Sequence, residues 1–305
     1  MVFIIPKTLD IKSVVCYNVK MIVRKSMYKI VFKQKLNDLV TKIGVAAPEI
    51  ASAAKAGQFV ILRPFDDSER IPLTVHDCDA DNGTVFVIYQ KMGRTTMELD
   101  TLNEGESLCD IVGPLGNPTV THGFKKVAVV GGGVGCAIAF PVAKDLKKNG
   151  AQVTCITGFR SSDLVILEKE FSQISDSFYL MTDDGSAGEH GLVTNKLEEL
   201  ILSGEKFDEV IAIGPIIMMK FVCELTKKYG VKTIISMNSI MVDGTGMCGG
   251  CRLTVDGETK FACVDGPDFD GHKVDFDECM RRSTFYKDFE TREREKACRL
   301  LEGKI

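Results

Sequence analysis

The stretch KVAVVGGGVGCAIAF, from Lys126 to Phe140, decides the fold class of this chain. An apolar run ends at Val130, a glycine-rich turn follows, and a helix-forming run begins after the turn. Such a turn lets backbone amides and the start of a helix approach the pyrophosphate of a dinucleotide closely. Glycines at this position also permit close packing, so that role stays open for each of them. The candidate dinucleotide-binding residues are Gly131, Gly132, Gly133 and Gly135.

The sequence after this stretch alternates between strand and helix patterns. The apolar runs QVTCITG, FYLMT, EVIAIG and KTIIS are separated by charged or amphipathic segments. Such alternation requires a parallel sheet with right-handed crossovers, so we expect a doubly wound α/β nucleotide-binding domain over residues 121–237. Asp184, Gly185 and Gly214 follow later strands, at the carboxyl edge where ligands of such sheets bind. Ordinary turn chemistry is the alternative for these three residues.

The sequence before Lys126 has a different rhythm. Short apolar or alternating runs, among them QFVIL, IPLTVH and TVFVIYQ, are separated by turn residues. This pattern predicts a small closed β-barrel over residues 27–120. One helical stretch is expected near Thr96 to Leu102. The chain-breaking segment GPLGNP, residues 113–118, indicates the domain boundary.

Two predicted barrel strands carry polar residues at their ends. RIPLT begins one at Arg70, and YQKMGRTTMEL ends another and enters the helical stretch. An arginine fork suits a phosphate, a threonine hydroxyl can bond a flavin ring, and a helix start can bind a pyrophosphate. A surface arginine and a helix cap explain the same residues equally well. The candidate cofactor-binding residues here are Arg70, Pro72, Leu73, Thr74, Ile88, Gln90, Gly93, Thr95 and Thr96.

The most specific motif lies within residues 238–281. Asp243, Cys248, Cys251 and Cys263 are spaced D-x4-C-x2-C-x11-C in a glycine-rich run. Plant-type [2Fe-2S] sites have cysteines at the same x4 and x2 spacing, and glycines let backbone amides point at thiolates. The sequence therefore predicts a [2Fe-2S] cluster with Asp243 as its fourth ligand. A zinc ion on the same four residues, or free core cysteines, is the alternative.

The residues between the last two cysteines predict a β-hairpin. RLTVDGETKFA consists of two alternating runs joined by Asp256 and Gly257, a strong two-residue turn signal. Pairing across this turn sets Val255 opposite Glu258 and Cys251 beside Ala262. We therefore expect the hairpin to bring Cys251 and Cys263 together.

The two ends of the chain carry weaker signals. ECMRRSTFYKDFETREREKACRLLEGKI reads as one charged amphipathic helix, and residues 282–305 are assigned to it. Residues 1–26 are treated as an N-terminal extension without an assigned function. Their short apolar run ends at Pro6, too early for a secretory signal.

Composition excludes several classes of function. The chain has 305 residues, 45% of them hydrophobic and 26% charged, which is typical of a globular protein with room for two domains. Its net charge of -4 does not favour nucleic acid or an anionic membrane. Eleven cysteines, an odd number without a secretory signal, favour a reducing cytoplasm over a disulfide framework. The four dispersed histidines match no hydrolase motif.

A barrel, a nucleotide domain and a cysteine loop in this order resemble the ferredoxin-NADP reductase superfamily, and more closely its dihydroorotate dehydrogenase electron-transfer subunit branch. RIPLT, GPLGNP, TDDGS, MVDGTGMCGGCR and FACVDGPDFDGHKVDFDE resemble the small subunits of electron-bifurcating NADH-dependent reduced ferredoxin:NADP oxidoreductases in that branch. The resemblance covers essentially residues 27–282. The dihydroorotate members have cysteine where this chain has Asp243, whereas the bifurcating members have aspartate.

The resemblance implies FAD on the barrel, NAD(H) at the glycine loop and a [2Fe-2S] cluster on the four predicted ligands. Arg70 and Thr74 match the family's Arg...Ser/Thr motif, although the arginine usually stands three residues before the hydroxyl and here stands four before it. Gly93, Thr95 and Thr96 match its pyrophosphate loop. The resemblance also implies a heterodimer with a large flavin and iron-sulfur subunit, through which ferredoxin is reached.

The expected chemistry needs no acid, base or nucleophile from the protein. A flavin converts the hydride of a nicotinamide into the single electrons that a cluster accepts. Ile213 stands where a cysteine often precedes this family's Gly-Pro motif, so no catalytic cysteine is assigned. Two other functions stay open: an electron-transfer subunit of dihydroorotate dehydrogenase, and a zinc-bearing interaction module without redox activity. Arg160 could meet a 2′-phosphate, so the residues alone leave NAD against NADP open.

Overall fold

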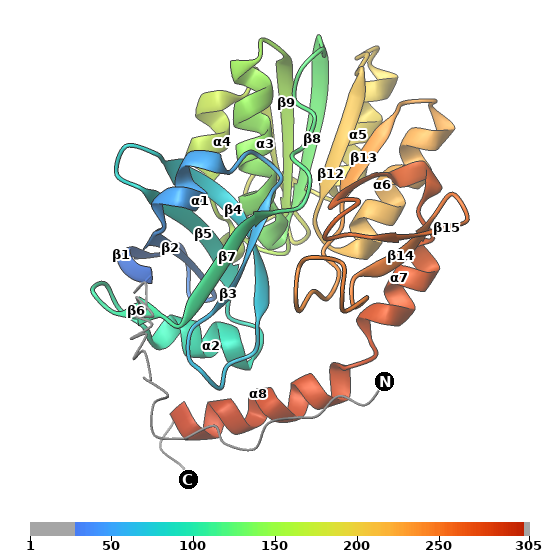
Figure 1. Cartoon of the computed structure of the whole chain (residues 1–305). Helices are drawn as coiled ribbons and strands as arrows, with labels where there is room; N and C mark the ends of the chain where they lie inside the picture. Colours follow the sequence, from blue (N-terminus) through green and yellow to red (C-terminus); the bar gives the residue numbers. More distant parts are fainter. Residues whose placement is uncertain (1–27, 302–305) are drawn as a thin grey trace, which may run out of the picture.

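The computed structural model describes residues 28–301, with side chains up to residue 296. The predicted extension 1–26, Met27 and the last four residues of the predicted final helix lie outside the described residues. Figure 1 shows a barrel, an α/β layer beside it, and a hairpin with two helices that lead the chain back beneath the barrel.

The first part is the predicted antiparallel barrel. Its strands are β1 (Tyr28–Lys35), β2 (Val40–Ala46), β3 (Phe59–Arg63), β4 (Ile71–Asp79), β5 (Thr84–Gln90), β6 (Ser107–Leu108) and β7 (Asp110–Leu115). They follow the order β6-β1-β2-β5-β4-β3-β7. The two edge strands, β6 and β7, are separated in sequence only by Cys109, so the chain itself closes the sheet.

Two short helices accompany the barrel. The helix expected near residue 96 is α2 (Arg94–Thr101). The second, α1 (Pro48–Ala53), was not predicted. Its signals are a proline in the first turn and two buried apolar residues, Ile50 and Ala51. Six residues are too few to show a helical period in the sequence.

The second part is the predicted doubly wound layer. Its strands are β8 (Lys126–Gly132), β9 (Gln152–Phe159), β10 (Ser177–Thr182), β11 (Glu189–His190), β12 (Glu209–Ile213), β13 (Thr233–Ser236) and β16 (Asp268–Asp270). Its helices are α3 (Cys136–Lys148), α4 (Glu168–Ile174), α5 (Val193–Leu202) and α6 (Ile216–Lys228). The order β11-β10-β9-β8-β12-β13-β16 reverses direction at β8 and β12, which is the switch point where ligands of such folds bind.

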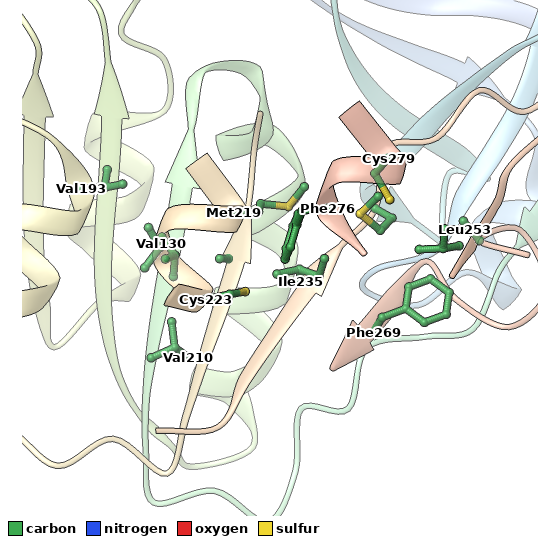
Figure 2. Packing of buried hydrophobic residues seen from close by; sticks show 14 of the residues in the cluster. Val130, Val193, Val210, Met219, Cys223, Ile235, Leu253, Phe269, Phe276 and Cys279 are labelled. Carbon is green, nitrogen blue, oxygen red and sulfur yellow. The ribbon is translucent and has the colours of Figure 1, made fainter. Parts of the chain in front are cut away.

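The third part is built into the second rather than separate from it. Strand β16, from the segment predicted as the cluster region, pairs antiparallel with β13, with Phe269 opposite Ile235. Figure 2 shows the shared core, in which Met219 and Ile235 lie between Val130 of the sheet and Leu253 of the hairpin. The hairpin strands are β14 (Arg252–Val255) and β15 (Glu258–Phe261). The cluster region is thus anchored by a strand and by a continuous apolar core.

The prediction of a single closing helix is wrong. The structure has two helices, α7 (Phe276–Ser283) and α8 (Lys287–Leu301). Thr284 ends α7, because its amide and its hydroxyl both donate to the Arg281 carbonyl, at 3.3 and 2.8 Å. The run Ser283, Thr284, Phe285 and Tyr286 has low helix propensity, which favours a break here. Helix α8 then runs beneath the barrel beside α2 (Figure 1).

None of the helices within residues 28–301 is both long enough and apolar enough to cross a lipid bilayer.

Candidate functional site

The hairpin has the register that the sequence predicted. Val255 pairs with Glu258 across the turn, and the Ala262 amide donates to the Cys251 carbonyl at 3.2 Å. Asp256 and Gly257 both have positive φ, 53° and 77°, as a tight two-residue turn requires. The Sγ atoms of Cys251 and Cys263 consequently lie 3.3 Å apart in a buried site.

The other two predicted ligands form a second pair. The Cys248 thiol lies near the Asp243 carboxylate, and its interaction with the carboxylate is the largest cause that holds the pKa of Asp243 well below its usual range. The Thr245 hydroxyl and the Met247 amide also donate to Asp243 Oδ2, at 2.8 and 2.9 Å. Its other oxygen, Oδ1, is buried without a hydrogen-bond partner. This carboxylate therefore keeps one oxygen available for a ligand.

The arrangement of the four predicted ligands in two pairs fits a binuclear cluster better than one ion. Among the described residues, no three His, Cys, Asp or Glu side chains converge closely enough to share a single metal ion. A [2Fe-2S] cluster needs two protein donors on each of two irons, and the four residues are arranged as two pairs. A structural zinc ion needs all four donors around one centre.

The glycine-rich loop directs amides at the cysteine sulfurs. The Gly250 amide donates to Cys248 Sγ at 3.4 Å, and the Cys263 amide donates to Cys251 Sγ at 3.4 Å. The Gly246 amide bonds Cys263 and opposes the rise in the pKa of that thiol, which burial and the neighbouring Cys251 cause. Gly246 has a φ of +87°, which a residue with a side chain rarely adopts. The loop thus presents positive dipoles to each thiolate.

The four glycines at the end of β8 and in the turn after it have two roles. A Cβ on Gly135 would lie 2.6 Å from the Ile213 carbonyl and 2.7 Å from Gly214 Cα, so this glycine serves close packing between neighbouring strand ends. Gly131 and Gly132 are also enclosed, by Cys136 and Met218. Only Gly133 of the four has positive φ (+55°) and open space where a Cβ would stand. The packing interpretation therefore fits three of these glycines, and Gly133 faces the free space at the switch point.

The later candidate residues lie along the same carboxyl edge. Gly214 packs against Gly132 across the switch point, where a Cβ would lie 3.1 Å from Gly132 Cα. Asp184 is exposed, and the hydroxyl and amide of Ser186 donate to its Oδ1 at 2.6 and 2.9 Å, which lowers its pKa. Gly185 has φ of +73° in this turn. Hydrogen bonds within this turn thus explain the position of one carboxylate oxygen of Asp184, Oδ1.

The barrel candidates are spread over different faces. Pro72 and Thr74 pair with Ile61 and Phe59 of β3, which belong to the core shared with the second sheet and the hairpin. Leu73 packs into the barrel interior instead. Two further candidates lie on β5: Ile88 packs against the second domain, and Gln90 is half-buried at the strand end. Of these five residues, only Pro72 and Thr74 are thus aligned along the face that the hairpin region covers.

The start of α2 divides its candidates in the same way. The Thr96 hydroxyl accepts from the Met92 and Gly93 amides, each at 3.0 Å, so it caps the helix. The Thr95 hydroxyl is buried without a partner. A Cβ on Gly93 would meet nothing within 4 Å. Gly93 therefore borders open space that suits an anion at the helix start, and the Thr95 hydroxyl beside it has no hydrogen-bond partner.

Arg70 and the segment GPLGNP have contacts that the sequence did not indicate. Arg70 Nε donates to the Val242 carbonyl, at 3.0 Å, next to Asp243. Asn117 Nδ2 donates to the Val264 carbonyl, at 3.0 Å, next to Cys263. The sequence indicates this segment as a domain boundary and as part of the family resemblance, without these contacts. Its polar Asn117 between chain-breaking residues was the one available signal.

The chain is similar to characterised groups of proteins. The model of the iron-sulfur cluster binding domain of dihydroorotate dehydrogenase B matches residues 238–275. A Thermotoga maritima protein named as a homolog of the dihydroorotate dehydrogenase B (NAD(+)) electron transfer subunit is 45% identical over 265 residues, 87% of this chain and 93% of that protein. The Clostridium perfringens electron transfer subunit of dihydroorotate dehydrogenase B is 32% identical, over 80% of this chain and 98% of that protein.

A solved structure extends the similarity to the whole fold. It comes from a study of flavin-based electron bifurcation by the NADH-dependent reduced ferredoxin-NADP oxidoreductase. Its chain is 43% identical, superposes with a TM-score of 0.84, and matches over 88% of this chain and 97% of its own length. The chain therefore belongs to the dihydroorotate dehydrogenase B electron-transfer subunit family and is a flavin and iron-sulfur oxidoreductase subunit of the ferredoxin-NADP reductase type.

Proposed function

We propose that this chain is the small subunit of an electron-bifurcating NADH-dependent reduced ferredoxin:NADP oxidoreductase. The observation that carries the proposal is the aspartate at the first ligand position, whose Oδ1 is buried without a partner beside Cys248. The similarity to the bifurcating enzyme's solved chain over nearly its full length supports the same assignment.

In this proposal, the three sites hold FAD, NAD(H) and a [2Fe-2S] cluster. Asp243 and Cys248 hold one iron, and Cys251 and Cys263 hold the other. When bound, FAD exchanges electron pairs with the nicotinamide and single electrons with the cluster. Gly93, Thr95 and the face bearing Thr74 hold FAD, and the free space at Gly133 receives the dinucleotide pyrophosphate.

The protein residues position these groups and set their electrostatics. Amides from Gly246, Gly250 and Cys263 stabilise negative charge on the cysteine sulfurs. The buried Cys251 and Cys263 exclude water from one side of the cluster, whereas Cys248 is exposed. The cluster thus has an open side toward a partner, which we assign as a large flavin and iron-sulfur subunit that reaches ferredoxin. None of the nine described cysteines forms a disulfide, which supports a cytoplasmic location.

Asp243→Cys tests the ligand assignment. Anaerobically purified wild-type protein should contain iron, acid-labile sulfide and flavin. Replacing the carboxylate by a thiolate should change the electron paramagnetic resonance spectrum and the midpoint potential of the reduced cluster, because ligand identity sets cluster potential. Asp265→Asn is the matched control, since Asp265 lies in the same segment and only accepts from the Phe261 amide, at 2.7 Å.

Two results would contradict this proposal. Identical spectra and potentials for wild type and Asp243→Cys would remove Asp243 from the coordination sphere. Colourless protein without iron and sulfide would favour the zinc-bearing module.

A second candidate is the electron-transfer subunit of dihydroorotate dehydrogenase, as the Clostridium perfringens relative is named. Co-purification with a dihydroorotate-oxidising partner, rather than with a large subunit that oxidises NADPH, would establish it.

A further inference from the structure

The cluster-binding segment is hydrogen-bonded to the barrel next to its first and its last ligand. Val242 directly precedes Asp243, and its carbonyl accepts from Arg70 Nε at 3.0 Å. Val264 directly follows Cys263, and its carbonyl accepts from Asn117 Nδ2 at 3.0 Å. Both donors belong to the barrel part of the chain. Each proposed iron therefore has one ligand whose neighbour is tied to the barrel.

The backbone around these two bonds is also tightly packed. The Asn117 amide donates to the Gly266 carbonyl at 2.7 Å. A Cβ on Gly116 would lie 3.0 Å from Pro267 Cδ, and one on Gly244 would lie 2.7 Å from Leu115 Cδ1. Thus β7 and the residues after it pack against the cluster-binding segment next to its first ligand, at Gly244, and after its last ligand, at Gly266 and Pro267.

A third polar contact lies farther along the same segment. The Thr119 hydroxyl donates to Asp268 Oδ2 at 2.5 Å. Asp268 is half-buried, and desolvation of its carboxylate raises its pKa. The chain from Asn117 to Thr119 is thus joined to residues 264–268 by side-chain and backbone bonds. A rigid connection of this kind fixes the segment relative to the barrel.

We propose that Asn117 and Arg70 are positioning residues that hold the two ends of the cluster ligand loop at a fixed distance from the flavin-binding barrel. This inference rests on the proposed function, since it takes FAD and a [2Fe-2S] cluster as the bound groups. When bound, FAD would accept the electron pair of NADH and pass both electrons on, one after the other, because a [2Fe-2S] cluster accepts one electron at a time. Electron tunnelling weakens steeply with distance, so the two bonds act on the rate of this step.

Asn117→Ala is the primary test because Asn117 is not a candidate for binding FAD or the cluster. The variant loses the Val264 bond and retains the backbone bond to Gly266. Loss of one hydrogen bond, about 0.5 to 1.5 kcal/mol, should raise amide hydrogen exchange in residues 262–268 of the holoprotein about two- to tenfold. Cluster reduction after mixing with NADH should slow, whereas flavin reduction should keep its wild-type rate.

Arg70→Lys tests the other end of the loop. Lysine keeps a positive charge near the barrel and lacks the guanidinium Nε that reaches Val242. Exchange should rise in residues 240–248 and stay unchanged in residues 262–268, the reverse of the Asn117 pattern. Asn82→Ala is the matched control, because Asn82 bonds only within the β4–β5 turn, to Asp79 Oδ2 at 2.7 Å. It should change neither region.

The results separate this inference from a structural role and from the proposed function. An exchange increase spread evenly over the chain in Asn117→Ala would overturn it, as would unchanged exchange with unchanged cluster reduction. Iron, sulfide and flavin contents are measured in every sample. Their absence from wild-type protein would refute the proposed function, whereas full contents with wild-type behaviour in both variants would refute only the positioning role.

Discussion

His76 should make the junction between the barrel and the second domain sensitive to acid. The side chain is 3% exposed, its Nδ1 donates to the Ala137 carbonyl of α3 at 2.8 Å, and its ring stacks on Phe140 with centroids 5.4 Å apart. Burial is the largest cause that lowers its pKa, to about 4, and the charges of Lys42 and Lys144 lower it further. The bond to Ala137 and the charge of Asp77 act in the opposite direction.

The sign and size of the effect follow from the two states. An unfolded histidine has a pKa near 6.5, so below that pH the unfolded state binds more protons than the folded state. Stability is therefore lost as the pH falls from about 6.5 to about 4. With a folded pKa of about 4, His76 removes about 2 kcal/mol from the free energy of unfolding by pH 5. That equals a fall of about 4 to 8 °C in melting temperature for a domain of this size.

His76→Asn isolates this contribution. The asparagine amide can keep the bond to Ala137, and it does not titrate. The variant should melt below wild type at pH 7.5 because it loses the stacking on Phe140. The gap between the two melting temperatures should narrow by several degrees at pH 5. The other histidines and the half-buried Asp268, whose raised pKa acts with the opposite sign, are common to both proteins and cancel.

Parallel melting temperatures from pH 7.5 to pH 5 would refute the reasoning. They would mean that His76 is hydrated, or is already charged in the folded protein. Differential scanning calorimetry at fixed ionic strength is the suitable assay, because screening changes the lysine contributions.

Two further pairs of variants test the packing of the site. Gly135→Ala should destabilise the second domain by about 3 kcal/mol, because the new Cβ meets backbone at 2.6 Å. Gly133→Ala should lower stability by about 1 kcal/mol and should mainly weaken NADH binding, because its Cβ fills the open space. Thermal melts and NADH titration of both variants check these expectations. Ile61→Ala and Ile43→Ala should each lower the free energy of unfolding by about 2 to 5 kcal/mol, because both side chains are fully buried. Only Ile61→Ala should lower the iron content after anaerobic reconstitution, because Ile61 lies against Gly244 next to the proposed ligand Asp243. Equal NADH affinity in both glycine variants, or equal iron in both isoleucine variants, would contradict these assignments.

Local patterns predicted the cluster hairpin well. The turn at Asp256 and Gly257, together with alternation in the flanking residues, is enough to set the register that places Cys251 beside Cys263. Strand and helix alternation likewise predicted the parallel strands β8, β9, β10, β12 and β13 and the helices between them, because each element carries its own period, whereas the edge strands β11 and β16 were not predicted. These features depend on residues close together in the sequence.

Features that depend on distant contacts were not predicted. Arg70 reaches a carbonyl 172 positions away, and no local pattern distinguishes that contact from a phosphate contact. The four glycines at the end of β8 and in the turn after it look alike in the sequence, yet only the fold shows that Gly135 packs against backbone and Gly133 does not. The break between α7 and α8 depends on Thr284, whose ability to end a helix competes with the charged periodicity around it.

The antiparallel strand β16 has a consequence for any attempt to shorten this protein. It covers the outer edge of β13, and Phe269 on it fills part of the core shared with the second sheet. Removing residues after 237 would expose a row of unpaired backbone groups beside an apolar surface, which is a template for aggregation. A flavoprotein without the cluster could therefore not be made from this chain by truncation alone. Such a truncated flavoprotein would need a replacement edge strand, because the segment that carries the proposed cluster ligands also completes the sheet.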